Sequence, residues 1–434
     1  MSTPSKPATD TSRRTFLKSS TAATVGASLA TIATSQAVHA QGSDLLRIGL
    51  IGCGGRGTGA AKNAMNADPK CQLTVMADAY DDRLNRQSRP ALERDKGLAS
   101  KIKVTDDTSH VGLDAYKRVM DSNVDVVLLC TPPQFRPVQL RAAIEAGKHV
   151  FCEKPVAVDA PGVRSVMETS QMAKEKNLSL VSGLCWRYDR GVKATIERIK
   201  AGMIGDVVAI QENYLANTLW HRGRKPEWTD MDYQLRNWLY YTWLSGDHIV
   251  EQHIHSLDKA VWLMNDEPPV SAIGLGGRQV RIEPRFGHIF DHFAVCYEWA
   301  NGVKTFSYTR QMAKCKNETE DFVIGTKGRA KVLANQIEPT DGDSWKFSGA
   351  KPSMYDLEHQ ALFAGIRSGK ILNNGHYMCI STMVAIMGRE ACYSGQKIEW
   401  DKALASEVRL GPETIEPGQA LEYSVAMPGR TKPS

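Results

Sequence analysis

The chain has 434 residues, of which 42% are hydrophobic and 24% are charged, so it is long and apolar enough to form two domains with substantial cores. Its formal net charge is +6, and +3 of this comes from the first forty residues, which hold four basic side chains and one aspartate. The rest of the chain carries too little charge to indicate nucleic-acid binding, and it has no zinc-finger spacing or internal repeat.

The N-terminal residues resemble a targeting segment. Residues 12–18 read SRRTFLK, and a mildly apolar stretch rich in Ala, Ser and Thr follows to residue 35. Residues 38–40, VHA, offer small side chains suited to signal cleavage, and the stretch is too short and too polar for a good membrane-spanning helix. We therefore predict a twin-arginine export signal over residues 1–40 and a periplasmic or otherwise exported protein. The alternative is a chance pair of arginines in a tail.

The nine cysteines do not indicate a disulfide framework. Cys53 lies in a glycine loop, and Cys130 and Cys152 lie in or beside apolar segments that we predict to be buried strands. We interpret them as small buried hydrophobic residues, which suits a protein that folds in a reducing compartment.

A glycine loop follows the first apolar segment, LRIGLI at residues 46–51, which predicts a buried strand. In the G-x-G-x-x-G spacing of a dinucleotide site, the first glycine allows a tight turn, the second lets a pyrophosphate approach, and the third lets helix and strand pack closely. The N-terminus of the following helix then offers free N–H groups to the anion. We predict that this loop binds the cofactor through Gly52, Gly54, Gly55, Arg56 and Gly57.

A carboxylate ends the second predicted strand, at residues 72–77. Asp78 follows Gly52 by 26 residues, close to the interval of about 20 found in dinucleotide-binding folds. Its carboxylate can accept hydrogen bonds from the adenosine ribose and would repel a 2′-phosphate, which favours NAD over NADP. Asp81 or Asp82 could share this role. The alternative for Asp78 is a helix N-cap or a surface carboxylate.

Strands and helices continue to alternate beyond this point. Apolar segments at residues 124–133, 148–155 and 178–183 predict strands, and helices are predicted at about 135–146 and 161–176. This alternation predicts an α/β fold with a Rossmann-type, doubly wound parallel sheet. Ligands bind beside the carboxyl ends of such strands, so we expect a substrate contact from Trp186 and cofactor contacts from Thr131, Pro132, Glu153, Lys154 and Arg187.

Residues 146–155, AGKHVFCEKP, carry a family resemblance. Together with the glycine loop and the TPP that ends the preceding strand, the Glu-Lys-Pro motif resembles the glucose–fructose oxidoreductase, inositol dehydrogenase and rhizopine catabolism family (Gfo/Idh/MocA), from about Leu46 to at least Ser406. The resemblance implies a nicotinamide-dependent oxidoreductase acting on sugars or polyols. It also implies that Lys154 lies beside the nicotinamide and the reacting carbon. The alternative for Lys154 is a solvated lysine after a strand.

The pattern changes after a predicted helix at residues 191–201. Residues 293–310 predict a hairpin with Asn301 and Gly302 as a two-residue turn, and residues 321–333 predict a second hairpin. We therefore expect a C-terminal α+β domain with a large, mainly antiparallel open sheet. The family resemblance associates such a sheet with subunit contacts, so we expect a homodimer or homotetramer.

Two further helices close the predicted fold, at residues 355–368 and 377–394, and each is ended by a glycine. The expected domain boundaries are residues 45–185 for the NAD-binding domain, 186–410 for the substrate and oligomerisation domain, and 411–434 for a C-terminal tail.

A cluster of titratable residues lies in the segment SGDHIVEQHIHSLD, which starts at residue 245. If residues 247–264 form one helix, then His253 lies on a separate face, and one stripe carries His248, Glu251, His255 and Asp258. The family resemblance implies an Asp-x-x-x-His pair here, facing the nicotinamide and the substrate, with Glu251 in place of the aspartate. Two alternatives remain open, a zinc or manganese site without a recognised metal motif and a buried polar network without a chemical role. We predict no metal.

Oxidation of a secondary alcohol requires removal of a hydride and of the hydroxyl proton. An imidazole suits proton removal, so we predict His255 as the base. Lys154 can bind the same oxygen and stabilise developing alkoxide charge, and the two residues could exchange roles. Glu251 could orient the substrate. His248 and Asp258 are further candidates for substrate contact.

An aromatic and basic segment lies just before the cluster, at residues 217–243. Aromatic faces stack on sugar rings and arginines bind hydroxyl groups or carboxylates, so this segment could contact the substrate through His221 and Arg222. The alternative is a helix core or a subunit contact.

Export would restrict the reaction, because soluble NAD(H) is not expected to be regenerated outside the cytoplasm. One solution is a bound cofactor that is recycled by a second carbonyl substrate. Another is a reaction without net redox change, in which transient sugar oxidation allows a glycosidic group to be eliminated. A third possibility is a dinucleotide-binding or sugar-binding protein without catalysis. We favour the oxidoreductase because, by the family resemblance, Lys154 in its Glu-Lys-Pro motif and His255 in its register match the commoner family arrangement. The presence of both residues also argues against a protein that only binds.

Overall fold

The structure is a computed structural model that describes residues 44–412, 414–415, 418 and 420–433, and Leu46–Ser434 form one compact unit. The predicted export signal lies outside the described residues. Within the described part of the chain, no helix is long and apolar enough to cross a membrane. All nine cysteines are free thiols.

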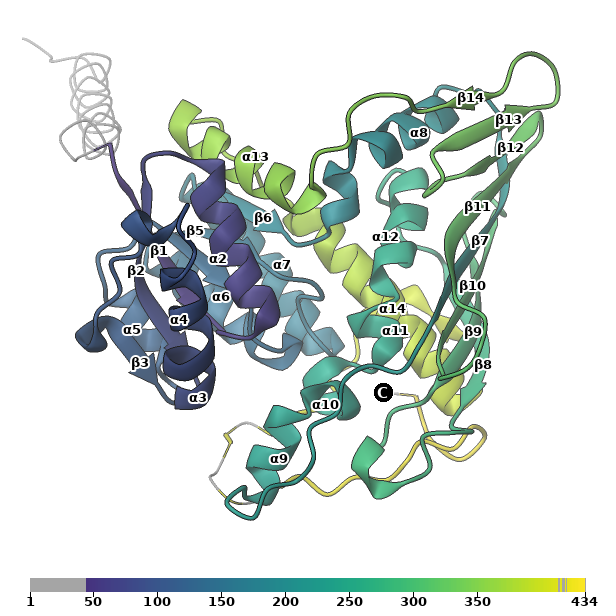
Figure 1. Ribbon diagram of the computed structural model, residues 1–434. Coiled ribbons are helices and arrows are strands. Elements are labelled where there is room, and N and C mark those ends of the chain that lie inside the picture. The colour runs from purple at the N-terminus through teal and green to yellow at the C-terminus, as the bar shows by residue number, and fades with distance from the viewer. Residues whose placement is uncertain (1–43, 413, 416–417, 419, 434) are drawn as a thin grey trace, which may run out of the picture. The chain divides into compact units, whose positions relative to one another are not determined.

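A six-stranded parallel sheet forms the first half of this unit, which confirms the predicted fold class (Figure 1). Its strand order is β3-β2-β1-β4-β5-β6, so the order reverses beside β1, the point at which open α/β sheets bind ligands. The strands are β1 (Leu46–Ile51), β2 (Cys71–Asp78), β3 (Ser109–Val111), β4 (Val126–Leu129), β5 (His149–Cys152) and β6 (Leu180–Ser182).

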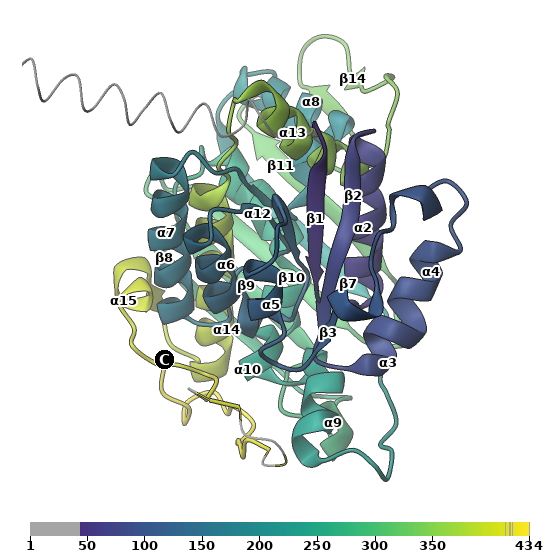
Figure 2. The same cartoon turned by 90° about the vertical axis from the view of Figure 1, so that its left-hand side faces the viewer.

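Helices cover both faces of this sheet (Figures 1 and 2). Leu50, Leu128 and Phe151 lie in one buried cluster with residues of α2 (Gly55–Ala67) and α13 (Met354–Ser368). Because both faces are buried, the strands are continuous apolar runs rather than alternating ones. The opposite face is covered by α5 (Tyr116–Met120), α6 (Arg136–Glu145) and α7 (Ala160–Glu175).

A nine-stranded sheet forms the second half and is antiparallel except for the pair β7 and β10. Its order is β14-β13-β12-β11-β7-β10-β9-β8-β15. The strands are β7 (Val207–Ala216), β8 (Ser271–Gly277), β9 (His292–Glu298), β10 (Lys304–Gln311), β11 (Glu318–Gly325), β12 (Gly328–Lys331), β13 (Gln336–Pro339), β14 (Trp345–Lys346) and β15 (Ile398–Glu399).

Helices cover one face of this sheet and leave apolar side chains on the other. α12 (Ile254–Leu263) and α14 (Gly375–Ser394) pack on the covered face, and α8 (Arg190–Lys200) packs on α12 (Figure 1). Strand β10 shows the resulting alternation of exposed and buried residues. Four large hydrophobic side chains are exposed on β8 and β10, namely Ile273, Leu275, Phe306 and Tyr308.

The β9–β10 hairpin corrects the prediction of a two-residue turn. The Trp299 N–H donates to the Val303 oxygen and the Gly302 N–H donates to the Trp299 oxygen, both at 2.9 Å, so three residues form the loop. Gly302 has a φ of 82°, whereas Asn301 does not have positive φ. A two-residue type I′ turn needs positive φ at both central positions, so this loop is one residue longer than predicted.

The predicted helix at residues 247–264 is also corrected, because it is broken into α11 (His248–Glu251) and α12. The Gln252 and His253 N–H groups both donate to the His248 oxygen, at 2.9 and 3.0 Å, which ends the first helix in a wide turn. The His253 ring then turns to the sheet, with Nε2 2.5 Å from Ser307 Oγ on β10. The side chains of the cluster therefore do not share one helical stripe.

Candidate functional site

The glycine loop between β1 and α2 has the geometry that a dinucleotide pyrophosphate requires. Gly52 has a φ of 92°, and an added Cβ would lie 2.6 Å from the Cys130 carbonyl carbon. An added Cβ on Gly57 would lie 1.8 Å from the Gly52 oxygen, so a side chain there would force α2 away from the loop. Around Gly54 and Gly55 an added Cβ would meet no atom within 4 Å. The first turn of α2 therefore presents open backbone to a phosphate group.

Asp78 ends β2 and braces this loop. Its Oδ2 accepts a hydrogen bond from the Cys53 N–H at 2.6 Å, and its Oδ1 accepts one from the Tyr80 N–H at 2.9 Å. Burial raises the pKa of the Asp78 carboxyl, while these two hydrogen bonds oppose the shift. The sequence pattern indicated a ribose contact for Asp78 but not this bracing role.

A pocket of about 490 Å³ is lined by residues from both the first and the second half of the compact unit. Twelve of the predicted site residues line it: Gly52, Gly54, Gly55, Arg56, Gly57, Asp78, Thr131, Pro132, Lys154, Arg222, Glu251 and His255. Six others lie outside the lining: Glu153, Trp186, Arg187, His221, His248 and Asp258.

Three predicted catalytic side chains come together in the pocket. Lys154 follows β5, Glu251 ends α11 and His255 lies in the first turn of α12. Lys154 Nζ donates to the Glu251 backbone oxygen at 2.5 Å and lies 3.2 Å from Glu251 Oε1. The two charged side chains are 13% and 17% exposed, so their charges are paired and largely shielded from solvent but lie at the pocket surface.

His255 is held as a neutral imidazole near pH 7. Burial lowers its pKa well below the usual value, and the positive charges of Lys154, Lys259 and Arg56 lower it further. Its Nδ1 atom is buried without a hydrogen-bond partner in the described part of the chain. The ring is therefore deprotonated and able to accept or share a proton, but the site offers little to stabilise an imidazolium.

Glu153 lies behind the pocket and holds Arg56. Its Oε1 is 2.6 Å from Arg56 Nε, and its Oε2 accepts a hydrogen bond from the Lys154 N–H at 3.1 Å. A second carboxylate, Glu358 of α13, is completely buried 3.8 Å from Arg56 Nη2. Burial and then the Glu153 charge raise the pKa of Glu358 well above its usual value. Arg56 thus lies in the first turn of α2, and the two carboxyl groups of Glu153 and Glu358 lie beside its guanidinium.

Arg187 and Asp258 bind each other rather than the pocket. Arg187 Nη2 is 2.9 Å from Asp258 Oδ1 and 2.7 Å from Asp266 Oδ1, and Ser381 of α14 donates to Asp258 at 2.8 Å. The Arg187 guanidinium also lies over the Tyr377 ring at 3.8 Å. These buried contacts hold α12 against α14, so they support the helix that carries His255 without reaching a ligand.

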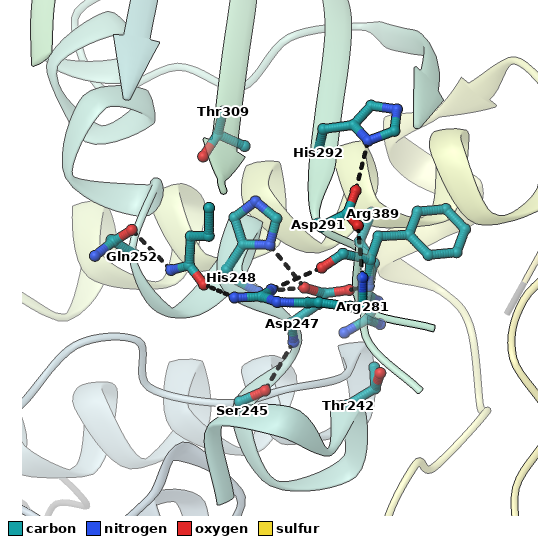
Figure 3. Close-up of polar contacts among 12 residues, drawn as sticks. Thr242, Ser245, Asp247, His248, Gln252, Arg281, Asp291, His292, Thr309 and Arg389 are labelled. Carbon is teal, nitrogen blue, oxygen red and sulfur yellow. Dashed lines mark hydrogen bonds and ion pairs between the residues drawn. The ribbon is translucent and has the colours of Figure 1, made fainter. Parts of the chain in front are cut away.

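His248 is likewise turned away from the pocket. Its Nδ1 lies 3.0 Å from Asp247 Oδ1 (Figure 3), and its ring packs against Phe293 with 4.9 Å between centroids. Burial lowers the pKa of His248, although Asp247 opposes this shift. Among the described residues, no group of three or more His, Cys, Asp or Glu side chains is arranged to hold a metal ion. His248 lies outside the pocket that Glu251 and His255 line, so the three side chains of the zinc or manganese alternative are not brought together.

The aromatic segment at residues 217–243 contributes only part of its side chains to the pocket. Trp220 and Arg222 line it, with the Arg222 guanidinium 4.5 Å from the Trp220 ring centroid. His221 lies outside, with Nε2 3.0 Å from the Arg285 backbone oxygen. Trp186, the other predicted aromatic contact, packs beside a buried lysine of α12.

The pocket lining also contains residues that were not predicted individually, among them Tyr80, Arg83, Tyr214, Arg236 and Gln252. Arg236 lies in the aromatic and basic segment at residues 217–243, and Gln252 is adjacent to Glu251, so these two could have been found from their neighbours. The other three belong to no motif.

Comparison with known proteins agrees with this arrangement. Residues 46–184 match the model described as oxidoreductase family, NAD-binding Rossmann fold, and residues 192–331 match the GFO/IDH/MocA C-terminal domain. The chain is 29% identical to a myo-inositol 2-dehydrogenase of Thermotoga maritima over 68% of its own length and 77% of the relative. It is 25% identical to a 2,7-anhydro-N-acetylneuraminate hydratase of Escherichia coli, over 66% and 68% of the two chains.

A solved structure shows the same fold. A levoglucosan dehydrogenase in complex with NADH and levoglucosan has a TM-score of 0.65 and 18% identity, over 82% of this chain and 99% of that one. The two family models match the two halves of the structure, one the parallel sheet with its glycine loop and the other the mixed sheet. The chain therefore belongs to the Gfo/Idh/MocA family of NAD-binding oxidoreductases.

Proposed function

We propose that the protein moves a hydride between a bound nicotinamide dinucleotide and a secondary hydroxyl group of a sugar, polyol or sugar derivative. The observation that carries the proposal is the convergence of Lys154, Glu251 and His255 on the pocket that the glycine loop also lines. The inositol dehydrogenase relative supports the substrate class.

The residues of the pocket fit such a cofactor and its chemistry. When bound, NAD(P) supplies the hydride acceptor, or the donor in the reverse direction. His255 is deprotonated near neutral pH and can take up the hydroxyl proton. The Lys154 ammonium can donate to the same oxygen and stabilise its developing negative charge, and the two residues could exchange roles. Glu251 holds Lys154 Nζ in place.

The glycine loop and Arg56 would hold the pyrophosphate, and Asp78 favours NAD over NADP because its carboxylate would repel a 2′-phosphate. We propose that the cofactor stays bound and is recycled by a second carbonyl substrate. Export by the twin-arginine route would make such recycling necessary, because free NAD(H) is not expected to be regenerated outside the cytoplasm.

Two outcomes compete with this proposal. The first is a reaction that oxidises the sugar transiently and eliminates a neighbouring group, which would use the same residues. The relative named a hydratase supports this alternative. A binding protein without catalysis would retain the nucleotide site alone. The exposed apolar face of the second sheet supports the proposal of a homodimer or homotetramer.

One experiment separates these readings. The purified protein is loaded with NAD, and absorbance at the NADH band is followed while myo-inositol, D-glucose or D-galactose is added, followed by a second sugar as oxidant. In parallel, 4-nitrophenyl glycosides of D-glucose and D-galactose are added and release of nitrophenol is followed. Reduction by one sugar and reoxidation by another supports the proposal. Release of a leaving group from a glycoside without net reduction supports elimination, and no change with any sugar leaves the binding protein.

Variants then test the site. Lys154→Met and His255→Phe should each lower kcat by about 10²- to 10⁴-fold, the usual contribution of a proton-transfer group, with NAD still bound. Asp258→Asn removes a charge outside the pocket, so it serves as a control that weakens only the packing of α12. Unchanged turnover in both pocket variants would contradict the assigned roles of Lys154 and His255.

A further inference from the structure

Gln252 lies between Glu251 and the helix that carries His255, and it lines the pocket. Its side chain begins a chain of hydrogen bonds that ends at Arg281 (Figure 3). Its Oε1 accepts a hydrogen bond from Gln311 Nε2 at 2.9 Å. Gln311 Oε1 in turn accepts a hydrogen bond from Arg281 Nη2. Gln311 is 2% exposed and Arg281 is 1% exposed, so water does not compete for these bonds.

Arg281 fixes the direction of every bond in this chain. A guanidinium has five N–H donors and no acceptor, so the Gln311 atom that it contacts must be the amide oxygen. The nitrogen of Gln311 is then at the other end of the amide and must meet an oxygen, which is Gln252 Oε1. The remaining end of Gln252 is its NH₂ group. The Gln252 side chain forms no other hydrogen bond with the residues that the structure describes, so this NH₂ group is available to a ligand in the pocket.

Arg281 is itself held firmly, so the direction cannot easily reverse. Its Nη1 donates to the Phe290 oxygen at 2.8 Å, and its backbone N–H donates to Asp291 Oδ2 at 3.0 Å. Burial lowers the pKa of Arg281, while the negative charges of the nearby Asp247 and Asp291 oppose this shift (Figure 3). Successive hydrogen bonds that start from a buried cation polarise one another in the same sense, which strengthens the final donor.

We propose that Gln252 is a substrate-recognition residue that presents only a hydrogen-bond donor to the pocket, with its orientation set by Arg281 through Gln311. This inference rests on the proposed function. The group that it recognises is an acceptor oxygen of the substrate, such as a carbonyl, carboxylate or ring oxygen or the lone pair of a hydroxyl. Glu251, the neighbouring residue, presents a carboxylate, so adjacent residues offer a donor and an acceptor to adjacent oxygens of a polyol.

The test compares KM with kcat for the sugar, among myo-inositol, D-glucose and D-galactose, that the wild-type protein turns over fastest. Gln252→Met removes the donor without adding charge, and we expect KM to rise about tenfold, the upper range for one hydrogen bond, with kcat and NAD affinity changed much less. Gln252→Glu replaces the donor by an acceptor of the same shape, and its KM should rise further. Gln279→Glu, the same replacement at an exposed glutamine of the loop before β9, is the matched control.

Gln311 tests the origin of the direction. Gln311→Met removes the hydrogen bonds that link Arg281 to Gln252, so the Gln252 amide can rotate. The KM of this variant should therefore lie between that of the wild type and that of Gln252→Met. Thermal melting and bound NAD content confirm that each variant is folded, and Gln311→Glu, which keeps an acceptor for Arg281 but loses the donor to Gln252, serves if Gln311→Met does not fold.

The outcomes are distinct. Wild-type turnover with an unchanged KM in both Gln252 variants contradicts the inference alone. A KM that rises in the Gln252 variants but not in the Gln311 variants contradicts the role of Arg281. A wild-type protein that transfers no hydride to or from any sugar contradicts the proposed function and this inference together.

Discussion

Arg236 in α9 (Asp230–Arg236) donates to both carboxylate oxygens of Asp82 in α3 (Asp81–Arg83), at 2.8 and 3.1 Å. Its guanidinium also lies 3.8 Å from the ring centroid of Tyr80, whose hydroxyl donates to Asp232 at 3.0 Å. Tyr80 and Arg236 line the pocket together with Asp78, which marks the end expected for the adenosine ribose. These contacts therefore close that end of the pocket between two distant parts of the chain.

Loss of this closure should speed cofactor release. We expect Arg236→Met to raise the NADH dissociation rate by about tenfold, because a charge-assisted bidentate pair is lost but Asp82 is partly solvated, which limits the effect. Stopped-flow fluorescence of NADH displaced by excess NAD measures the rate. Arg86→Met, which breaks an exposed pair with Asp81 outside the pocket, is the control. Equal rates for the two variants would show that the contacts do not retain the cofactor.

Alanine substitutions at two glycines of the loop should have different effects on stability and NAD binding. Gly57→Ala places a Cβ 1.8 Å from the Gly52 oxygen, so it should lower the melting temperature as well as NAD affinity. Gly55→Ala meets no atom within 4 Å, so the protein should fold normally and lose NAD affinity only through crowding of the pyrophosphate. Calorimetric titration with NAD and thermal melting separate the two effects. Normal NAD binding by Gly57→Ala would contradict the assigned site.

A buried ion pair supports the helix that carries His255. Lys259 Nζ is 2.9 Å from Asp321 Oδ2, and both side chains are 1% exposed. Asp321 lies directly opposite Glu212 in the second sheet, and burial together with the Asp321 charge raises the pKa of Glu212 well above its usual value. Burial thus favours the protonated form of Glu212, and Lys259 forms its ion pair with Asp321.

Removal of one partner should leave a buried charge. We expect Lys259→Met to lower the free energy of unfolding by about 3–5 kcal/mol, the usual cost of breaking a buried pair. Lys259→Met combined with Asp321→Asn should recover most of that loss, because no uncompensated charge remains. Urea unfolding measures both, and an additive double variant would contradict the assigned pairing.

Buried neutral histidines should make stability depend on pH. Burial lowers the pKa of His288 and of His359 to about 3, and it lowers those of His253 and His255 well below their usual value. In the unfolded chain these groups bind protons near pH 6.5, so the unfolded state binds more protons below that pH and the folded state loses stability as pH falls toward about 3.

We expect each such histidine to contribute about 1.4 kcal/mol of lost stability per pH unit inside that window. His359→Phe keeps an aromatic ring against Phe151, which lies 4.2 Å from the His359 ring, and should make the slope shallower by one proton. Urea midpoints between pH 4.5 and 7.5 test this. An unchanged slope in His359→Phe would mean that the ring is protonated in the folded protein.

The fold was predictable where local patterns agree with tertiary structure. Most strands of the first sheet are buried apolar runs, and glycines end α13 and α14 in the left-handed conformation, as predicted. The prediction failed at two places where particular hydrogen bonds set the geometry, one within a loop and one between side chains of different segments. Trp299 and Val303 close the hairpin loop, and the bond from His253 to Ser307 breaks the predicted helix.

The site was predictable where a motif fixes backbone geometry, as at the glycine loop and Lys154. It was less predictable where the position of a side chain was inferred from helical spacing alone. His248 and Asp258 share the expected period with His255, yet their partners Asp247 and Arg187 hold them away from the pocket. Arg236 and Gln252 lie in or beside segments that were predicted to reach the pocket, but no local pattern records their contacts with Asp82 and Gln311, which are far away in the sequence.

The position of α13 has a consequence for synthesis of the chain. This helix covers the same face of the first sheet as α2, yet it ends at Ser368, almost two hundred residues after the last strand of that sheet. A ribosome-bound chain that has completed β6 therefore still exposes the surface that Leu362 and Phe363 later bury. The dinucleotide half cannot finish folding until nearly the whole polypeptide has emerged, so the two halves are expected to unfold as one cooperative unit.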